Sequence, residues 1–368
     1  MPTRLARRRK ERMLTQEELA ELLGVAVISI RRWETGQAPQ PIYLRKLCEV
    51  LEATPAELGL APQDPLEQLR LEEAERAVRR LCRDYSSTPP ATLLPWVRQR
   101  LTQISQLQGN RLNLTQQQQL HVNTGWLQLL LSALHNDLGQ REQAWDARNL
   151  ALYWGEESRD ANLIAWAYET PSWFALWDGR ARDALDYGEA GFRAAPPGSS
   201  GWITNKLKLA QAHARMGDRL QAERELYEGR EELERWSLPE EPDHHFTFDP
   251  PKFDFYASST HSWLGQWREV EAHAREVIRC SSNPSTAAWV PTRVGMARLE
   301  LTQSLALRGE LEEALSQGLQ AFGPFLRINT LTRAAEVEAS LQEHYPREPG
   351  VLEFSERLTV ARGRLGEG

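Results

Sequence analysis

The chain has 368 residues, of which 41% are hydrophobic and 26% are charged, and these proportions are ordinary for a globular protein. No apolar run approaches the roughly 18 residues that a membrane-spanning helix needs, and no apolar stretch follows the basic N-terminus, so we expect neither a membrane segment nor a signal peptide. The three cysteines, Cys48, Cys82 and Cys280, lie far apart and form no CxxC pair, which argues against a disulfide framework and favours a reducing cytoplasm.

Charge is distributed unevenly along the chain. Residues 1–60 hold ten Lys/Arg and eight Asp/Glu, whereas the remaining residues hold 34 and 43. Six of the first twelve residues are basic. A small positive region on an acidic chain is typical of a local contact with a polyanion, although a solvated basic helix would carry the same charge.

The stretch LTQEELAELLGVAVISIRRWETG, residues 14–36, predicts two helices joined by a tight turn. Thr15 and Glu18 have the spacing of a capping box, and Gly24 allows a sharp change of direction. In the first helix, helical spacing predicts an apolar face made of Leu19, Leu22 and Leu23. In the second helix, the residues expected to face inward are Val25, Ile30 and Trp33. After the basic first helix and these two, a fourth helix is predicted to start at Pro41, and a short fifth one at residues 54–59.

These residues resemble the helix-turn-helix domain of the XRE (lambda and 434 repressor-like) family, in which five helices occupy about 60 residues. The resemblance is carried by turn, small and apolar positions: Leu14, Gln16, Leu19, Ala20, Gly24, Val25, Ile30, Trp33, Glu34 and Gly36. It implies that the second of the two central helices enters the major groove of DNA. The implied base-facing residues are Val27, Ile28 and Arg32. The implied backbone and phosphate contacts are Thr15, Gln16, Ser29 and Arg31, and Arg45 adds positive charge nearby.

One departure from the family concerns the start of the second helix. Ala26, Val27 and Ile28 are apolar where the family often has polar residues. Such side chains can contact a thymine methyl group but cannot form a bidentate hydrogen bond with guanine or adenine, so direct readout would fall mainly on Arg32. The alternative is a domain that no longer binds DNA and pairs only with a protein.

Beyond residue 60 the pattern is helical throughout. The segment APQDP at residues 61–65 is typical of a hinge, and two helices are predicted near residues 66–85 and 91–108. We therefore expect a helix-turn-helix domain at residues 1–60, a linker with connecting helices at 61–115, and a helical repeat domain at 116–368.

A repeat is visible in five glycines spaced by 40, 38, 48 and 44 residues: Gly139, Gly179, Gly217, Gly265 and Gly309. Five positions after each glycine stand Ala144, Ala184, Ala222, Val270 and Ala314. Seven positions before each stand Ser132, Ser172, Ala210, Ser258 and Thr302. Small residues where helices cross, with a glycine at the turn between them, predict paired helices, and a period of roughly 20 to 50 residues indicates an α-solenoid.

This register and the phrase GELEEALSQGLQAF, residues 309–322, resemble tetratricopeptide repeats. The resemblance covers about residues 120–325 in five pairs, with a capping pair predicted at 329–362, and the period exceeds the standard length of about 34 residues. In such repeats the first helices line a concave groove. The corresponding positions here are Trp126, Asn136, Trp166, Glu169, Trp173, Trp177, Gln211, Arg215, Phe255, Trp263 and Gln303. Aromatic rings with a few polar groups are typical of a peptide or small-ligand site, although the same tryptophans could fill gaps between helices.

The stretch DHHFTFDPPKFDFY, residues 243–256, lies in the longest interval between two of these glycines. Asp249 before two prolines predicts the start of a helix. Three interpretations remain open: a metal site, a lid that offers His245 and Phe246 to the groove, or a structural wedge. The metal site would use Asp243, His244, His245 and Asp249, although adjacent histidines on an extended segment point to opposite sides. The stretch also looks like one in uncharacterised actinobacterial regulators, and this resemblance implies a regulator.

Together these features predict an all-α, sequence-specific DNA-binding transcriptional regulator whose repeat domain binds a peptide, small-molecule or protein effector and mediates dimerisation. The architecture resembles the RRNPP regulators, which implies a cytoplasmic homodimer on a palindromic double-stranded operator, without a cofactor. The alternative is a protein-interaction scaffold that uses the helix-turn-helix as a tether. We expect no enzymatic activity, because the sequence has no Walker loop, no GxSxG and no HExxH.

Overall fold

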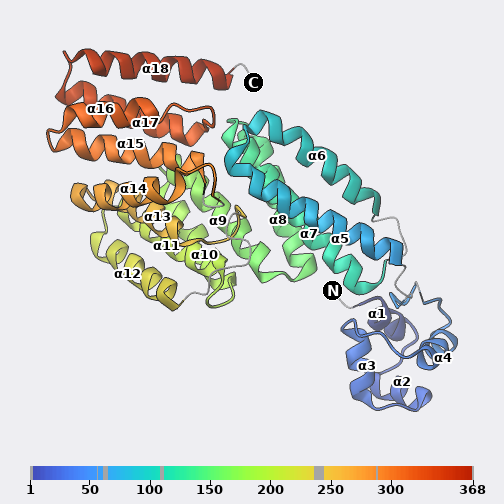
Figure 1. The fold of residues 1–368 in the computed structure, drawn as a ribbon. Helices are drawn as coiled ribbons and strands as arrows, with labels where there is room; N and C mark the ends of the chain where they lie inside the picture. The colour runs from blue at the N-terminus through green and yellow to red at the C-terminus, as the bar shows by residue number, and fades with distance from the viewer. Residues whose placement is uncertain are drawn as a thin grey trace. The chain divides into compact units, whose positions relative to one another are not determined.

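The computed structural model describes residues 3–55, 57–60, 65–107, 112–235, 244–286 and 289–366. Within these ranges the chain forms α-helices and one short 3-10 helix, with no strand (Figure 1). This confirms the predicted all-α fold. Among the described residues, no helix is long and apolar enough to cross a bilayer.

The chain divides into two compact units, each with a buried apolar core. The first comprises Met1–Val78, Gln99–Thr124 and Glu157–Arg159, and the second comprises Arg79–Arg98, Gly125–Glu156 and Asp160–Gly368. The helices that contribute residues to both are α5 (Pro65–Asp84), α6 (Pro90–Leu107), α7 (Leu114–Asp137) and α8 (Arg141–Ser158). The first two confirm the helices predicted near residues 66–85 and 91–108. Residues 61–64 of the expected hinge lie outside the described residues.

The first unit begins with four short helices around a small apolar core (Figure 1). They are α1 (Arg4–Glu11), α2 (Gln16–Leu23), α3 (Val27–Glu34) and α4 (Pro41–Leu51). Leu19, Ile30 and Leu47 are completely buried where these helices meet. The fifth helix expected at residues 54–59 is not seen, because the described residues of this segment form turns, and Ala56 lies outside them.

The predicted apolar face of α2 is correct only in part. Leu19 and Leu23 are buried, but Leu22 is 58% exposed. The short helix buries the stripe that runs through Leu19 and Leu23, and Leu22 lies about 100° from Leu23 around the helix. The prediction for Leu22 was therefore wrong, since apolar spacing over one turn does not fix how wide the buried stripe is.

Local interactions explain where α2 and α3 begin and end. The Thr15 hydroxyl accepts a hydrogen bond from the Glu18 backbone N–H, and the Glu18 carboxylate accepts one from the Thr15 N–H, which confirms the capping box. Gly24 ends α2 with φ +67°, a left-handed conformation that glycine adopts without steric cost. Pro41 occupies the first turn of α4, as predicted.

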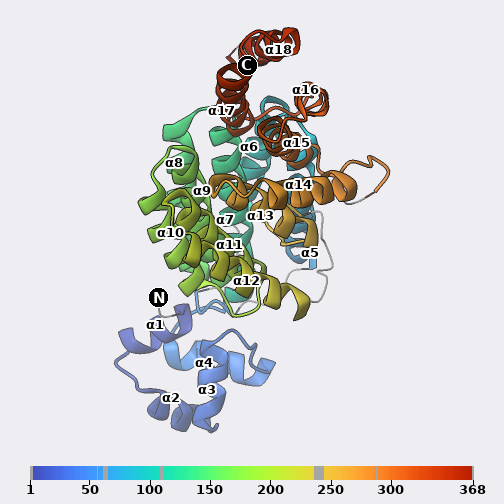
Figure 2. The same cartoon turned by 90° about the vertical axis from the view of Figure 1, so that its left-hand side faces the viewer.

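Helices α9 to α16 form a series in which each helix packs beside the next one along the chain (Figures 1 and 2). They are α9 (Ala161–Trp177), α10 (Ala181–Ala194), α11 (Ser200–Arg215), α12 (Arg219–Arg235), α13 (Pro250–Trp263), α14 (Trp267–Ser281), α15 (Pro291–Leu307) and α16 (Leu311–Gln320). The predicted final pair corresponds to α17 (Ile328–His344) and α18 (Pro349–Gly366). In addition, α9, α11, α13 and α15 each contact the next odd-numbered helix, up to α17, so the first helices of successive pairs form one layer.

The five predicted glycines lie at the turns within these helix pairs. Gly139, Gly179, Gly217, Gly265 and Gly309 have φ values between +69° and +85°. A Cβ at any of them would meet nothing within 4 Å, so glycine is required for its backbone conformation rather than for space. All ten small residues of the predicted register are buried, and the Ser132 and Ser172 hydroxyls donate to the carbonyls of Ala144 (2.7 Å) and Ala184 (2.8 Å). The paired-helix register is therefore confirmed.

Candidate DNA-binding surface and ligand cavity

The surface of α3 presents the residues predicted to contact bases. Arg32 is exposed, Ile28 is 51% exposed, and Val27 is half-buried. The other predicted DNA contacts keep all or part of their surface accessible: Thr15, Gln16, Ser29, Arg31 and Arg45. No described residue forms a hydrogen bond or ion pair with the Arg32 guanidinium, so this side chain is available to a duplex.

A buried ion pair fixes the position of α3 against α1. The Arg9 Nε donates to the Glu34 carboxylate at 2.7 Å, and both side chains are more than nine-tenths buried. A second nitrogen of Arg9 donates to the carbonyl of Leu14 at 2.7 Å. Because α3 is held through a buried charge pair, its exposed face has a defined orientation within the domain.

The same carboxylate extends this network to the surface. Gln16 Nε2 donates to Glu34 at 2.5 Å, and Gln16 Oε1 accepts from Arg31 Nε at 3.3 Å. Gln16 therefore connects the first turn of α2 with the exposed Arg31. Free amides and the positive end of a helix dipole occur at such an N-terminus, so the two side chains lie where a phosphate would be favoured.

The second unit contains a cavity of about 150 Å³. Residues of α9, α11, α13, α15 and α17 line it, together with residues near Tyr85 and His245. Six of the eleven predicted groove residues are in this lining, namely Trp166, Glu169, Trp173, Trp177, Gln211 and Phe255, and so is His245 of the predicted lid. The spacing relative to the turn glycines therefore predicts a shared site for side chains that lie up to 89 residues apart in sequence, from Trp166 to Phe255.

The other five predicted residues, Trp126, Asn136, Arg215, Trp263 and Gln303, lie outside the lining. Trp126 packs against Phe246 with ring centroids 5.4 Å apart, and Asn136 is 4% exposed. The Arg215 guanidinium lies 4.4 Å from the centre of the Trp263 ring. Trp126 thus packs against the loop that precedes α13, and Arg215 and Trp263 link α11 with α13.

Charged residues that the sequence interpretation missed also line the cavity: Asp137, Lys208, Lys252, Arg293 and Arg327. Lys252 stands thirteen residues before Gly265, at a position of the same register that selects Phe255. Asp137 stands two before Gly139, which is another of these positions. The spacing could therefore have indicated both, but Arg293 and Arg327 have no such signal.

Three buried ion pairs surround the cavity. Lys208 lies 3.3 Å from Glu169, and Arg327 lies 2.9 Å from Asp137. Arg293 donates to both oxygens of Asp249, at 2.8 and 3.0 Å. The Asp249 side chain is thereby held by Arg293 and does not cap α13, although α13 starts immediately after it as predicted.

Burial shifts the titration of several of these groups. It lowers the pKa of the Lys252 ammonium to about 8, although nearby Asp249 acts in the opposite direction. It raises the pKa of Asp137 to about 6, against the effect of Arg327. It also lowers the pKa of Lys208, which Glu169 opposes. Groups with displaced pKa values that line one cavity are more typical of functional sites than of surfaces.

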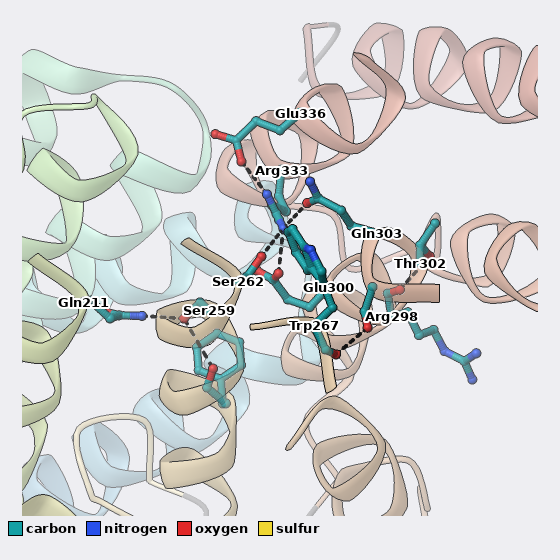
Figure 3. Close-up of polar contacts among 12 residues, drawn as sticks. Gln211, Ser259, Ser262, Trp267, Arg298, Glu300, Thr302, Gln303, Arg333 and Glu336 are labelled. Carbon is teal, nitrogen blue, oxygen red and sulfur yellow. Dashed lines mark hydrogen bonds and ion pairs between the residues drawn. The ribbon is translucent and has the colours of Figure 1, made fainter. Parts of the chain in front are cut away.

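A second polar network lies beside the cavity and is centred on Arg333 (Figure 3). One terminal nitrogen of its guanidinium donates to Ser262 Oγ and to the Glu300 carboxylate, each at 2.7 Å, and also to Gln303 Oε1. The other donates to Glu336 at 2.7 Å. Arg333 therefore joins α13, α15 and α17 through one buried side chain.

The residue 243–256 stretch combines two of the three interpretations. Asp243 lies outside the described residues. Phe246 is 5% exposed and packs against Trp126 and Trp166, with ring centroids 5.4 and 5.5 Å apart, and Phe248 is completely buried. These contacts favour the wedge, while His245 is part of the cavity lining, as the lid would require.

Comparison with known proteins identifies only the beginning of the chain. Residues 5–58 match the model of a helix-turn-helix family. No curated protein matches the chain. The region of α1 to α4 is therefore a helix-turn-helix domain of the XRE type, a DNA-binding fold, and the predicted resemblance is confirmed for this part of the chain. The tetratricopeptide resemblance of the later helices stays a prediction.

Proposed function

We propose that the protein is a sequence-specific transcriptional regulator of the cytoplasm, in which the helix-turn-helix domain binds DNA and the helical repeats bind an effector. The proposal that the domain binds a specific DNA sequence rests on Arg32, which is exposed and unpaired on a rigidly held α3. Arg32 is the one polar side chain among the three predicted base-facing positions. The cavity supports the second part, since aromatic rings and convergent polar groups are typical of ligand sites. We propose a binding protein and not an enzyme.

The proposal includes a homodimer. A single repressor-like domain reads only one half-site, and two copies related by a twofold axis read a palindrome whose half-sites are about one helical turn apart. The tetratricopeptide-like helix pairs would hold the two copies together. Binding of an effector changes DNA affinity only if the effector prefers one of two conformations of the dimer.

We expect Arg32→Ala to weaken binding to the specific operator by about 1–3 kcal/mol, because a bidentate contact with a base would be lost. Affinity for random duplex DNA should change much less. Both affinities can be measured for the full-length protein by fluorescence anisotropy at one salt concentration, since electrostatic binding depends on salt.

Arg45→Ala is the matched control, since Arg45 is also exposed but is expected to contact the backbone. It should weaken binding to specific and random DNA by similar factors. Equal losses on both duplexes for Arg32→Ala would reassign Arg32 to a phosphate contact, and no loss on either duplex would remove α3 from the interface.

A further inference from the structure

The cavity of the second unit has an unbalanced charge. Its lining includes the four cations Lys208, Lys252, Arg293 and Arg327. Three of them are paired with Glu169, Asp249 and Asp137, as described above. Lys252 is left over: within the described ranges of the chain, no carboxylate oxygen lies within 4.0 Å of its Nζ.

Lys252 is nevertheless 8% exposed and firmly positioned. Its ammonium donates to the carbonyl oxygens of His245 (2.6 Å) and Thr247, and it lies 5.5 Å from the centre of the Trp166 ring. An ammonium has three donors, so one N–H remains after these two bonds. A buried ammonium that is not directly paired with a carboxylate is costly, which favours an anion as the missing partner.

Two further donors in the same lining lack a partner. Arg327 Nη1 and Asn329 Nδ2 form no hydrogen bond with any described residue, and both side chains are more than nine-tenths buried. A buried donor without an acceptor costs about 1–3 kcal/mol. Together with Lys252, these groups place positive charge and unpaired donors around the cavity.

The remaining lining determines the shape of the occupant. Trp166, Trp173 and Phe255 contribute flat apolar surfaces. The volume of about 150 Å³ is similar to that of cavities that hold one benzene ring. The space therefore fits one ring or a flat group of similar size, with a short polar extension.

We propose that this cavity binds a small organic acid, whose anionic group pairs with Lys252 and whose flat body lies among Trp166, Trp173 and Phe255. This inference names the chemical class of the effector and rests on the proposed function. A carboxylate at the end of a peptide would offer the same anionic group, and the peptide probe below distinguishes these two sources.

The test uses three probes that share a phenyl ring and a short chain and carry an anionic, a neutral and a cationic polar group: phenylacetate, phenylacetamide and phenethylamine. Calorimetric titration of the full-length protein at neutral pH is expected to show that the acid binds about tenfold or more tightly than the amide, because a charge-assisted hydrogen bond is gained. The amine should bind more weakly still. Equal or tighter binding of the amide or the amine contradicts the proposal, as does the absence of binding by the acid at millimolar concentration.

Variants assign the charge preference to one residue. Lys252→Met should remove the difference between acid and amide, whereas Lys252→Arg, which keeps the positive charge, should retain it. Trp173→Leu should weaken the binding of the acid and of the amide by a similar factor, because it removes apolar surface without changing charge. If Lys252→Met does not fold, the comparison of the three probes still tests whether the cavity prefers an acid, and Lys252→Arg still tests whether a positive charge at this position is enough to keep that preference. A Lys252→Met protein that keeps the preference contradicts the assignment.

A pentapeptide that ends in phenylalanine distinguishes the two sources of the carboxylate. Tighter binding of this peptide than of phenylacetate overturns the small-molecule assignment. None of these titrations contains DNA, so their outcome does not depend on whether the protein binds DNA. If acids bind but do not change DNA affinity, the proposal that an effector controls DNA binding is contradicted, while the cavity remains an acid site. If a neutral compound binds in the cavity and changes DNA affinity, the proposal that the effector is an acid is contradicted, while effector control stands.

Discussion

Glu34→Ala is expected to destabilise the helix-turn-helix domain by about 3–5 kcal/mol, because it leaves the Arg9 guanidinium buried without its counter-charge. It also removes the acceptor of Gln16 and with it the link from α2 to α3. Small domains have stabilities of about 5–15 kcal/mol, so much of the folding free energy would be lost, and DNA binding with it. Hydrogen exchange of the α2 and α3 amides in the full-length protein measures this loss locally.

The control for this prediction is Glu17→Ala. Glu17 lies on the same helix pair, but its side chain is exposed and 3.9 Å from Arg31, so its removal should cost less than about 1 kcal/mol. The double variant Arg9→Met/Glu34→Leu should recover most of the stability, because no buried charge remains. If Glu34→Ala exchanges its amides as slowly as Glu17→Ala does, the buried pair does not hold α3 in place.

Arg333→Met should lower the stability of the second unit by a similarly large amount. Glu300 is 1% exposed and would lose its cation, at a cost of about 3–5 kcal/mol in the free energy of unfolding. Burial disfavours the Arg333 charge, but Glu300 and Glu336 outweigh this effect and raise the pKa of Arg333. Urea denaturation of the full-length protein, with the m-value checked for constancy, would report the change.

Arg298→Ala provides a control on α15. Arg298 is half-buried and donates to the neutral Gln317 at 2.8 Å, so its loss leaves no buried charge and should cost about 1 kcal/mol. Arg333→Met/Glu300→Leu should be more stable than Arg333→Met alone. Equal stability of Arg333→Met and Arg298→Ala would show that the Arg333 network does not hold α13, α15 and α17 together.

Features that depend on a few neighbouring residues could be predicted from the sequence. The Thr15–Glu18 capping box involves residues three positions apart, and Gly24 fixes a turn by its own conformation. The turn glycines and the small residues near them likewise follow from the geometry of two helices joined by a short connection. These predictions need no knowledge of distant parts of the chain.

The cavity was only partly predictable. The register relative to the glycines finds aromatic residues such as Trp166 and Trp173, but a lysine such as Lys252 is usually read as a surface residue. Contacts between distant segments have no local signal at all. The Arg327 guanidinium donates to the carbonyl of Tyr85, 242 residues earlier, at 2.6 Å. Residues outside the helix-pair register therefore could not be assigned to the cavity in advance.

The central claim is that α3 of the full-length protein reads a DNA sequence. Selection of duplexes from a random pool, followed by competition against random DNA at moderate salt, tests it most directly. We expect the selected duplex to bind about 1,000-fold or more tightly than random DNA, with dyad symmetry in the selected sequences. Equal affinity for all duplexes, with or without cell extract, would contradict the claim.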